Sequence, residues 1–455
     1  MSSESMPWVD RPKVIPGPKR LFPPMNLRDL AKDTFGYLTH LRETYGPISV
    51  ISTGVLNIYF MNDPEIIREV LVTKDADFQK GLSFRVAKRL LGDGLLTSEG
   101  EFHRQQRRLA QPAFHRQRIA NYAMIMENYA RAKAESWSNG DIVDMDLEMM
   151  KLTLSVVAKT LFDANVEEEA RAVGDALSAA MVIFDRTAWP MEPLVHRLPL
   201  ESNRRFNKGK QDLDNIVYRI IRERRASGED RGDLLSMLLA AQDEDDGHSM
   251  TDLQVRDEAV TIFLAGHETT ANILGWTWYN IARNPEVEAR IHTEVDAVIP
   301  KGLPAFEAFA QLPYTRDVFS EALRMYPPVY LVGRQAMRTT TVGPYRIPKW
   351  SIILISQFFM HRDPRFWDRP NEFEPSRWTD TMRERLPKFA YFPFGGGQRF
   401  CLGDQFAWME GVLILAILAH KWKMRLVDSA PIEPHPQVTL RPSKPIRMQL
   451  EARNP

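Results

Sequence analysis

Helical periodicity dominates the middle of the chain. From about residue 100 to residue 300, apolar positions recur at the spacing of one helix face. Breaks at Ser227–Asp233 and Gln242–Ser249, rich in acidic residues or glycine, are typical of solvated loops. Thr251-Asp252-Leu253-Gln254 has the form of a capping box, so we expect a helix from there to Asn284, ahead of Pro285. About 33 helical residues span about 50 Å, enough to cross a whole domain.

Strand signals are confined to two regions. Ile48–Phe60 holds two short apolar runs around Thr53-Gly54, and Arg334–Ile355 holds similar runs around a Gly343-Pro344 turn. Asp63-Pro64 supplies a cap and a first-turn proline for a helix. We therefore predict a mainly α fold with a minor β portion. A proline-rich extended segment should cover residues 1–25, and a single domain should cover residues 26–455.

Composition and charge narrow the classes of function. The chain has 59 basic and 59 acidic residues, so its net charge does not favour nucleic acid or an anionic membrane as a partner. Residues 1–8 lack the basic and apolar regions of a signal peptide. The longest apolar stretches, near Val412–Ala419 and Ile352–Ile355, are too short to span a bilayer. We expect a soluble, cytoplasmic protein without an integral membrane anchor.

Cys401 is the only cysteine in 455 residues. One thiol builds neither an internal disulfide nor a multi-cysteine zinc site. An inert buried thiol, a nucleophile and a single thiolate ligand to a metal cofactor remain open. The three glycines at 395–397 permit unusual backbone angles and close approach of a flat ligand. The apolar run Phe406–Ala419 indicates a helix that starts just after the cysteine, and a helix N-terminus favours a thiolate there.

The segment around this thiol resembles the haem-ligand signature of the cytochrome P-450 family. The matching positions are Phe394, Gly397, Arg399, Cys401 and Gly403, and Glu410 matches the following helix. The resemblance runs from about residue 25 to the C-terminus and is strongest to soluble bacterial members. It implies the P-450 fold, with haem b between the long central helix and the helix after the cysteine. By the same resemblance, Cys401 is the proximal iron ligand, Phe394 packs near the sulfur and Arg399 pairs with a haem propionate.

A second segment, Ala265-Gly266-His267-Glu268-Thr269-Thr270, lies within the long helix. By itself it indicates only a weak point or kink. Beside the cysteine signature it resembles the oxygen-activation motif of the family, in which a local opening of the helix leaves room for dioxygen. The resemblance implies that Thr269 and Glu268 are catalytic and relay protons. His267 is better explained as a packing residue.

A third signal is Glu321-Ala322-Leu323-Arg324. The i,i+3 spacing has no specificity, since it also occurs at Glu65 and Arg68. Its order relative to Phe373-Glu374-Pro375-Ser376-Arg377-Trp378 resembles the family pattern, which implies a buried structural triad of Glu321, Arg324 and Arg377.

Further cofactor contacts follow from the resemblance. His103 and Arg107 match an aromatic and an arginine that face one haem propionate, although the family more often has tryptophan at the first position. Arg334 matches another propionate-binding position. Taken singly, each of these residues would be assigned to a solvated surface.

The resemblance also implies a substrate pocket with an apolar lining, which favours a lipophilic substrate. The predicted lining residues are Phe184, Phe263, Leu264, Ala265, Val329, Leu331 and Val332. Apolar lining does not identify the molecule, so fatty acids, terpenoids, steroids and macrolides all remain open.

The predicted function is a haem-thiolate monooxygenase that uses dioxygen and inserts one oxygen atom by hydroxylation or epoxidation. About 50 residues follow Cys401 without a flavin or iron–sulfur segment, so we expect electrons from a separate ferredoxin or flavodoxin with an NAD(P)H-dependent reductase. One alternative is a haem-based gas sensor or carrier, which the Glu268-Thr269 pair disfavours. Another is a specialised member of the family that performs oxidative coupling or rearrangement.

Overall fold

The computed structural model describes residues 14–19, 23–54, 56–81, 83–163, 195, 198–240 and 250–453. Most of the predicted extended segment, residues 1–25, lies outside these residues. Of its described parts, residues 14–19 have no regular secondary structure, and residues 23–25 form a turn that enters a helix at Met25. The chain divides into two compact units. Unit 1 comprises Met1–Gly81, Leu331–Met360 and Pro387–Phe400, and unit 2 comprises Leu82–Tyr330, His361–Leu386 and Cys401–Pro455. One catalytic domain over residues 26–455 stays a prediction.

Unit 1 is organised around a five-stranded sheet in the order β1-β2-β8-β5-β3. The strands are β1 (Ile48–Ser52), β2 (Asn57–Met61), β8 (Ile352–Ile355), β5 (Val332–Ala336) and β3 (Phe78–Gln79). β1 and β2 pair as an antiparallel hairpin around Thr53-Gly54, as predicted, and β8 runs parallel to β2. A second hairpin joins β6 (Thr340–Val342) and β7 (Tyr345–Ile347) through the predicted turn, where Gly343 has a φ of 52°.

The helices of unit 1 are short and cover the sheet. They are α1 (Met25–Lys32), α2 (Thr34–Tyr45), α3 (Pro64–Arg68), α16 (Gln357–Met360) and the shorter turns η1 (Glu69–Thr73), η2 (Asp75–Asp77), η6 (Lys388–Ala390) and η7 (Gly397–Arg399). Side chains of α2, β1, β2 and α16 form an apolar core that includes Leu41, Ile51 and Phe60. The predicted helix start at Asp63 is confirmed, because its carboxylate accepts hydrogen bonds from the amides of Glu65 and Ile66.

Unit 2 is mainly helical. Before the long central helix come α4 (Ser83–Leu91), α5 (Gly100–Ala110), η3 (Gln111–Phe114), α6 (Arg116–Ser136), α7 (Met145–Phe162), α10 (Glu201–Ser227) and α11 (Leu234–Ala240). After it come α13 (Pro285–Val298), η4 (Ile299–Lys301), α14 (Ala305–Ala310), α15 (Pro313–Met325), η5 (Pro375–Arg377), α17 (Asp380–Arg385) and α18 (Asp404–Lys421). α10 ends at Ser227, where the break at Ser227–Asp233 is predicted, whereas the predicted break at Gln242–Ser249 lies outside the described residues.

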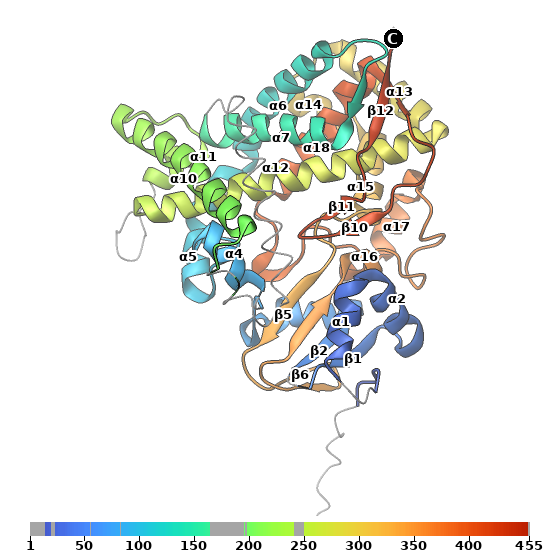
Figure 1. Ribbon diagram of the computed structural model, residues 1–455. Coiled ribbons are helices and arrows are strands. Elements are labelled where there is room, and N and C mark those ends of the chain that lie inside the picture. The colour runs from blue at the N-terminus through green and yellow to red at the C-terminus, as the bar shows by residue number, and fades with distance from the viewer. Residues whose placement is uncertain are drawn as a thin grey trace, which may run out of the picture. The chain divides into compact units, whose positions relative to one another are not determined.

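The long central helix is α12 (Asp252–Arg283), and its 32 residues confirm the predicted element. Thr251 and Gln254 form both halves of the capping box. Figure 1 shows α12 running through unit 2 with α7 alongside it, and α10 and α18 also pack on α12. The helix is buried from Val255 to Ile281 except at Ala265, Gly266 and Thr269.

Two small sheets complete unit 2. One has the order β4-β12-β9, from Ile142–Asp144, Arg447–Ala452 and Trp422–Leu426. The other is the hairpin of β10 (Pro434–Pro436) and β11 (Leu440–Pro442). In the part of the chain that the structure describes, every helix is too short or too polar to cross a membrane.

Candidate active site

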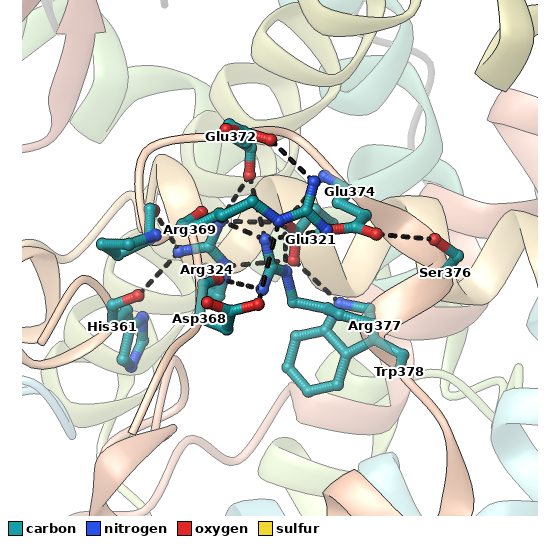
Figure 2. A network of polar contacts seen from close by, with 11 residues as sticks. Glu321, Arg324, His361, Asp368, Arg369, Glu372, Glu374, Ser376, Arg377 and Trp378 are labelled. Carbon is teal, nitrogen blue, oxygen red and sulfur yellow. Dashed lines mark hydrogen bonds and ion pairs between the residues drawn. The ribbon is translucent and has the colours of Figure 1, made fainter. Parts of the chain in front are cut away.

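Glu321 on α15 is the centre of a buried ionic network (Figure 2). Its Oε1 accepts hydrogen bonds from Arg324 Nη2 at 2.8 Å, from Arg377 Nε at 2.9 Å and from the Glu374 amide at 3.0 Å. Its Oε2 accepts from Arg324 Nε at 2.9 Å and from Trp378 Nε1 at 3.0 Å. Both oxygens of a completely buried carboxylate are therefore satisfied, and the three residues of the predicted triad lie together.

Arg324 is equally well satisfied. Besides its two bonds to Glu321, Nη1 donates to the carbonyls of His361 and Pro370, at 2.8 and 2.7 Å. Nη2 also donates to the Glu372 carbonyl at 3.0 Å. All five guanidinium N–H groups are used, which a lysine with three donors would not reproduce. This network fixes the segment 361–378 onto α15.

The glycines before the cysteine are required by the protein itself. In unit 1, Gly397 has a φ of 66°, and a Cβ there would lie 1.8 Å from the Leu71 carbonyl oxygen in η1. A Cβ at Gly396 would lie 2.5 Å from the ring of Phe389. At both positions a side chain would therefore collide with a neighbouring part of the same unit. Close approach of a flat ligand to these glycines stays a prediction.

Cys401 is exposed in the chain and lies in unit 2, three residues before α18. The Gly403 amide donates a hydrogen bond to the sulfur. Desolvation by the surrounding protein nevertheless raises the pKa of the thiol to about 11, and Asp404 adds to this, while Arg107 opposes it. That the loop and the following helix place this thiol to be a thiolate stays a prediction. A metal cation bound to the sulfur would displace the thiol proton, as cations do for coordinating thiols.

The buried helix α12 is accessible to solvent at the predicted oxygen-activation motif. Ala265 is exposed, and Gly266 and Thr269 are half-buried, in a stretch otherwise closed on all sides. Ala265 and Thr269 are one turn apart and share a helix face. The Thr269 hydroxyl donates to the Ala265 carbonyl at 2.8 Å. This face carries a hydroxyl and little side-chain bulk.

Glu268 is held by a different element. Its Oε1 accepts from Thr439 Oγ1 at 2.8 Å and from Arg441 Nη2 and Nε at 3.0 and 3.2 Å. The sequence analysis missed Thr439 and Arg441, which lie on the C-terminal hairpin, and no local motif marks them. It also missed Asp146 on α7. Desolvation raises the pKa of Asp146 to about 6; Arg441 opposes this, and Asp144 and Glu268 add to it.

α12 meets α18 directly beside the open face. The Thr270 side chain faces Glu410, whose carboxyl is fully buried. Burial raises the pKa of Glu410 well above its usual range, so this acid is neutral. Glu410 lies roughly 9 Å of helix from the start of α18, so the contact with the α12 motif falls in the first half of α18. His267 is buried against Phe263, with Nδ1 2.9 Å from the Phe263 carbonyl, which agrees with a packing role.

The remaining predicted cofactor contacts lie in both units. In unit 2, His103 and Arg107 are one turn apart on α5; His103 is buried and Arg107 half-buried. Desolvation lowers the pKa of Arg107, while Cys401 and Asp404 act in the opposite direction. In unit 1, Arg334 on β5 is buried, and Phe394 and Arg399 are half-buried. Their roles toward a cofactor stay predictions.

Of the predicted substrate residues, Phe184 lies outside the described part of the chain. Phe263 and Leu264 are buried, and Phe263 lines an apolar cavity of only about 10 Å³ with residues of α7, α10 and α11. In unit 2 Val329 is 40% exposed, whereas Leu331 and Val332 in unit 1 are half-buried. Ala265 and Val329 are thus the open positions among those described.

Comparison with known proteins decides the family. The cytochrome P-450 family profile matches residues 15–450. The chain belongs to the cytochrome P-450 family. Cyclooctatin synthase of Streptomyces melanosporofaciens is 39% identical over 93% of this chain and 92% of its own. Cyclooctat-9-en-7-ol 5-monooxygenase of the same organism is 37% identical over 84% and 83%. Pentalenene oxygenase of Streptomyces avermitilis is 33% identical over 90% and 91%. The predicted enzyme class, a P-450 monooxygenase, is confirmed.

Membership in the P-450 family implies a haem cofactor, and the residues of unit 2 fit it. The lone thiol is exposed at the start of α18, with a protein N–H directed at the sulfur. The α12 face at Ala265 and Thr269 is open where the rest of the helix is closed. A flat cofactor needs both features, a ligand on one side and a helix face without bulk on the other.

Replacing Glu321 with glutamine should destabilise this P-450 severely. Both Arg324 and Arg377 would lose their counter-charge inside the protein, which costs about 3–5 kcal/mol for a buried pair. Trp378→Phe removes one hydrogen bond to the same carboxylate and should cost about 1–2 kcal/mol. Urea denaturation followed by tryptophan fluorescence and circular dichroism measures both.

Glu65→Gln is the matched control, because Glu65 and Arg68 form the same i,i+3 ion pair on the surface, with side chains 75% and 51% exposed. We expect no measurable change in the denaturation midpoint there. Equal midpoints for Glu321→Gln and Glu65→Gln would contradict the assigned role of the network.

Asp146 should make stability depend on pH. Its folded-state pKa of about 6 lies above its ordinary value of 3.8, so the folded protein binds this proton more tightly. The proton on Asp146 therefore stabilises the folded state fully at a pH below the ordinary pKa of 3.8, and this stabilisation is lost as the pH rises through the folded-state pKa of about 6. Asp146→Asn removes the ionisation and should raise the thermal midpoint by a few degrees more at about pH 7.5 than at about pH 5. The exposed Asp428→Asn is the control; an equal gain for Asp146→Asn at both pH values would argue against the assignment.

Proposed function

We propose that this protein is a haem-thiolate monooxygenase that inserts one oxygen atom of dioxygen into an apolar cyclic substrate of terpenoid type, by hydroxylation or epoxidation. One observation carries the proposal. Within unit 2, the thiol at the start of α18 and the open Ala265–Thr269 face of α12 lie on two helices joined by the Thr270–Glu410 contact. The haem proposed there lies between these two helices.

Cys401 would hold the haem iron through its sulfur, and the bound cofactor supplies the oxygen chemistry. The Gly403 amide, which already donates to the sulfur, would stabilise the negative charge of the ligand. Arg107 supplies a positive charge facing Cys401 and Asp404 from α5. His103 and Arg107 are also the proposed donors to one propionate, since they share a face of that helix. The proposal also includes the roles predicted from the sequence, with Phe394 packed near the sulfur and with Arg399 and Arg334 at haem propionates.

Protons have to reach the open face of α12, and Thr269 and Glu268 are the proposed carriers. The Thr269 hydroxyl uses its hydrogen toward the Ala265 carbonyl, which leaves its oxygen as an acceptor on the open face. Glu268 directly precedes Thr269, so an acid and an alcohol occupy adjacent positions in the chain. Electrons are proposed to come from a separate redox partner, a ferredoxin or flavodoxin with its reductase.

The substrate class rests on the relatives. Pentalenene is named as an alkene and cyclooctat-9-en-7-ol as an unsaturated alcohol. Both names describe molecules with few polar groups. The open positions Ala265 and Val329 are apolar and offer such a molecule no charged partner. A terpenoid substrate is therefore favoured over the fatty acids, steroids and macrolides that the sequence left open.

Cys401→Ser tests the ligand. The reduced, carbon monoxide-bound protein should show the red-shifted Soret band of a thiolate ligand, and the serine variant should lose it. Because the chain has one cysteine, no second thiol complicates the result. A red-shifted band that persists in the variant would disprove the assignment of Cys401.

An optical titration tests the substrate class. The ferric protein is titrated with pentalenene and with cyclooctat-9-en-7-ol, and a straight-chain fatty acid is the comparator. We expect the cyclic molecules to shift the Soret band with at least about tenfold lower Kd, or about 1.4 kcal/mol. Tighter binding of the fatty acid would overturn the terpenoid proposal and leave the monooxygenase assignment intact.

A further inference from the structure

The Glu268 carboxylate is bound on one oxygen only. Its side chain is 7% exposed, and Oε1 accepts three hydrogen bonds, one from Thr439 and two from Arg441. Within the described residues no donor is recorded for Oε2. Three donors saturate the first oxygen, so a proton that binds this carboxylate binds at Oε2.

The hairpin that supplies these donors is fixed to α12 along one stripe. Glu268, Asn272 and Trp276 are spaced by four residues and share a helix face. Asn272 Nδ2 donates to Thr439 Oγ1 at 3.4 Å, and Trp276 Nε1 donates to the Leu440 carbonyl at 2.9 Å. The position of Arg441 is therefore set by the same helix that carries Glu268.

The hairpin is also joined to the segment after α15. The Leu440 amide donates to the Pro328 carbonyl at 3.0 Å, and the Tyr330 hydroxyl donates to the Gln437 carbonyl at 2.8 Å. Val329, between these two anchors, is exposed and belongs to the predicted substrate segment. One hairpin thus contacts both the acid and the two residues that flank Val329.

Arg441 supplies the positive charge of this cluster. The other titratable groups that face Glu268 or Arg441 are His267 on α12 and Asp146 on α7, with Asp144 beside Asp146. Burial lowers the pKa of His267, so its ring is neutral at neutral pH. The remaining groups are carboxyls, and none of them offsets a charge on Glu268.

We propose that Arg441 and Thr439 are positioning residues that hold the Glu268 carboxylate by Oε1 and leave Oε2 to take up and release the proton. Because the hairpin is also hydrogen-bonded to Pro328 and Tyr330, the positions of Arg441 and Thr439 depend on the position of the segment around Val329. The inference rests on the proposed relay role of Glu268 and Thr269. No electrons move: the carboxylate gains a proton from water at Oε2 and loses it toward the Thr269 oxygen.

The first test compares Arg441→Met, Arg441→Lys and Thr439→Val. We measure product and hydrogen peroxide per electron pair over a pH series, together with substrate Kd from the Soret shift. Arg441→Met should lower the product fraction on the order of tenfold, with substrate Kd unchanged. The acid limb of its pH profile should move to higher pH, because the buried carboxylate has lost its counter-charge. Arg441→Lys keeps the charge and should retain most of the product fraction and the wild-type acid limb.

The second readout needs no turnover. Infrared difference spectra between acid and neutral pH should show a new carboxylic-acid band in Arg441→Met that is absent from the Arg441→Met/Glu268→Gln double variant. Arg447→Met is the control, since Arg447 is an exposed arginine on β12, and it should change neither readout. If Arg441→Met does not fold, Arg441→Lys and Thr439→Val carry the test, and a Thr439→Val variant with wild-type coupling and pH profile overturns the proposal.

Thr269→Ala separates the positioning role of Arg441 and Thr439 from the proton-relay role of Glu268 and Thr269. If Thr269→Ala uncouples the enzyme while Arg441→Met leaves coupling, pH profile and infrared spectrum unchanged, the positioning role is wrong and the relay stands. If neither Thr269→Ala nor Glu268→Gln alters coupling, the relay is wrong and the inference falls with it. Thr293→Ala on α13, which removes the same kind of hydroxyl-to-carbonyl bond, controls for the loss of a helical threonine.

Discussion

The burial of α12 is the constraint on which unit 2 depends. A helix closed on all sides over more than twenty residues cannot leave its polar side chains to water, so many of them bond to neighbouring elements or to carbonyls of α12 itself. Arg256 pairs with Asp214 of α10, Glu258 accepts from the Leu95 amide, and Trp276 donates to the hairpin. Apolar packing supplies most of the stabilisation. These directional contacts decide where α10, the loop before α5 and the hairpin attach, and they leave the opening at Ala265 and Thr269 as the exception.

Glu321 and Glu268 are both buried carboxylates of unit 2 with arginine partners, and the number of donors separates their roles. Glu321 has five donors on two oxygens and no exposure, which leaves no position for a proton to bind without breaking a bond. Glu268 has three recorded donors, all on one oxygen, and keeps a small exposure. A saturated network is rigid and suits the attachment of a segment. A carboxylate satisfied on one side suits proton transfer, because the proton binds without loss of the bonds that orient the group.

Local signals made much of the fold predictable. The capping box at Thr251, the cap at Asp63 and the turn at Gly343 each act within a few residues, so a sequence pattern is enough to find them. The partners of Glu268 lie more than 170 residues away and belong to no motif, so only the folded chain brings them together. Cys401 shows the same limit. Its neighbours in sequence favour a thiolate, but desolvation depends on everything packed around the loop, and that effect is larger.

Burial in unit 2 opposes charge on titratable side chains, even where an arginine lies nearby, as Arg441 does for Asp146. It raises the pKa of Glu410 and of Asp146 and lowers that of His267. Each of these groups is shifted toward its neutral form because the interior solvates an ion poorly. A side chain that has to stay charged there therefore needs a counter-charge at hydrogen-bond distance, as Glu321 has in two arginines and Glu268 has in Arg441. At the thiol, Arg107 opposes the rise in the pKa, and a metal cation bound to the sulfur would supply the counter-charge that holds it as a thiolate.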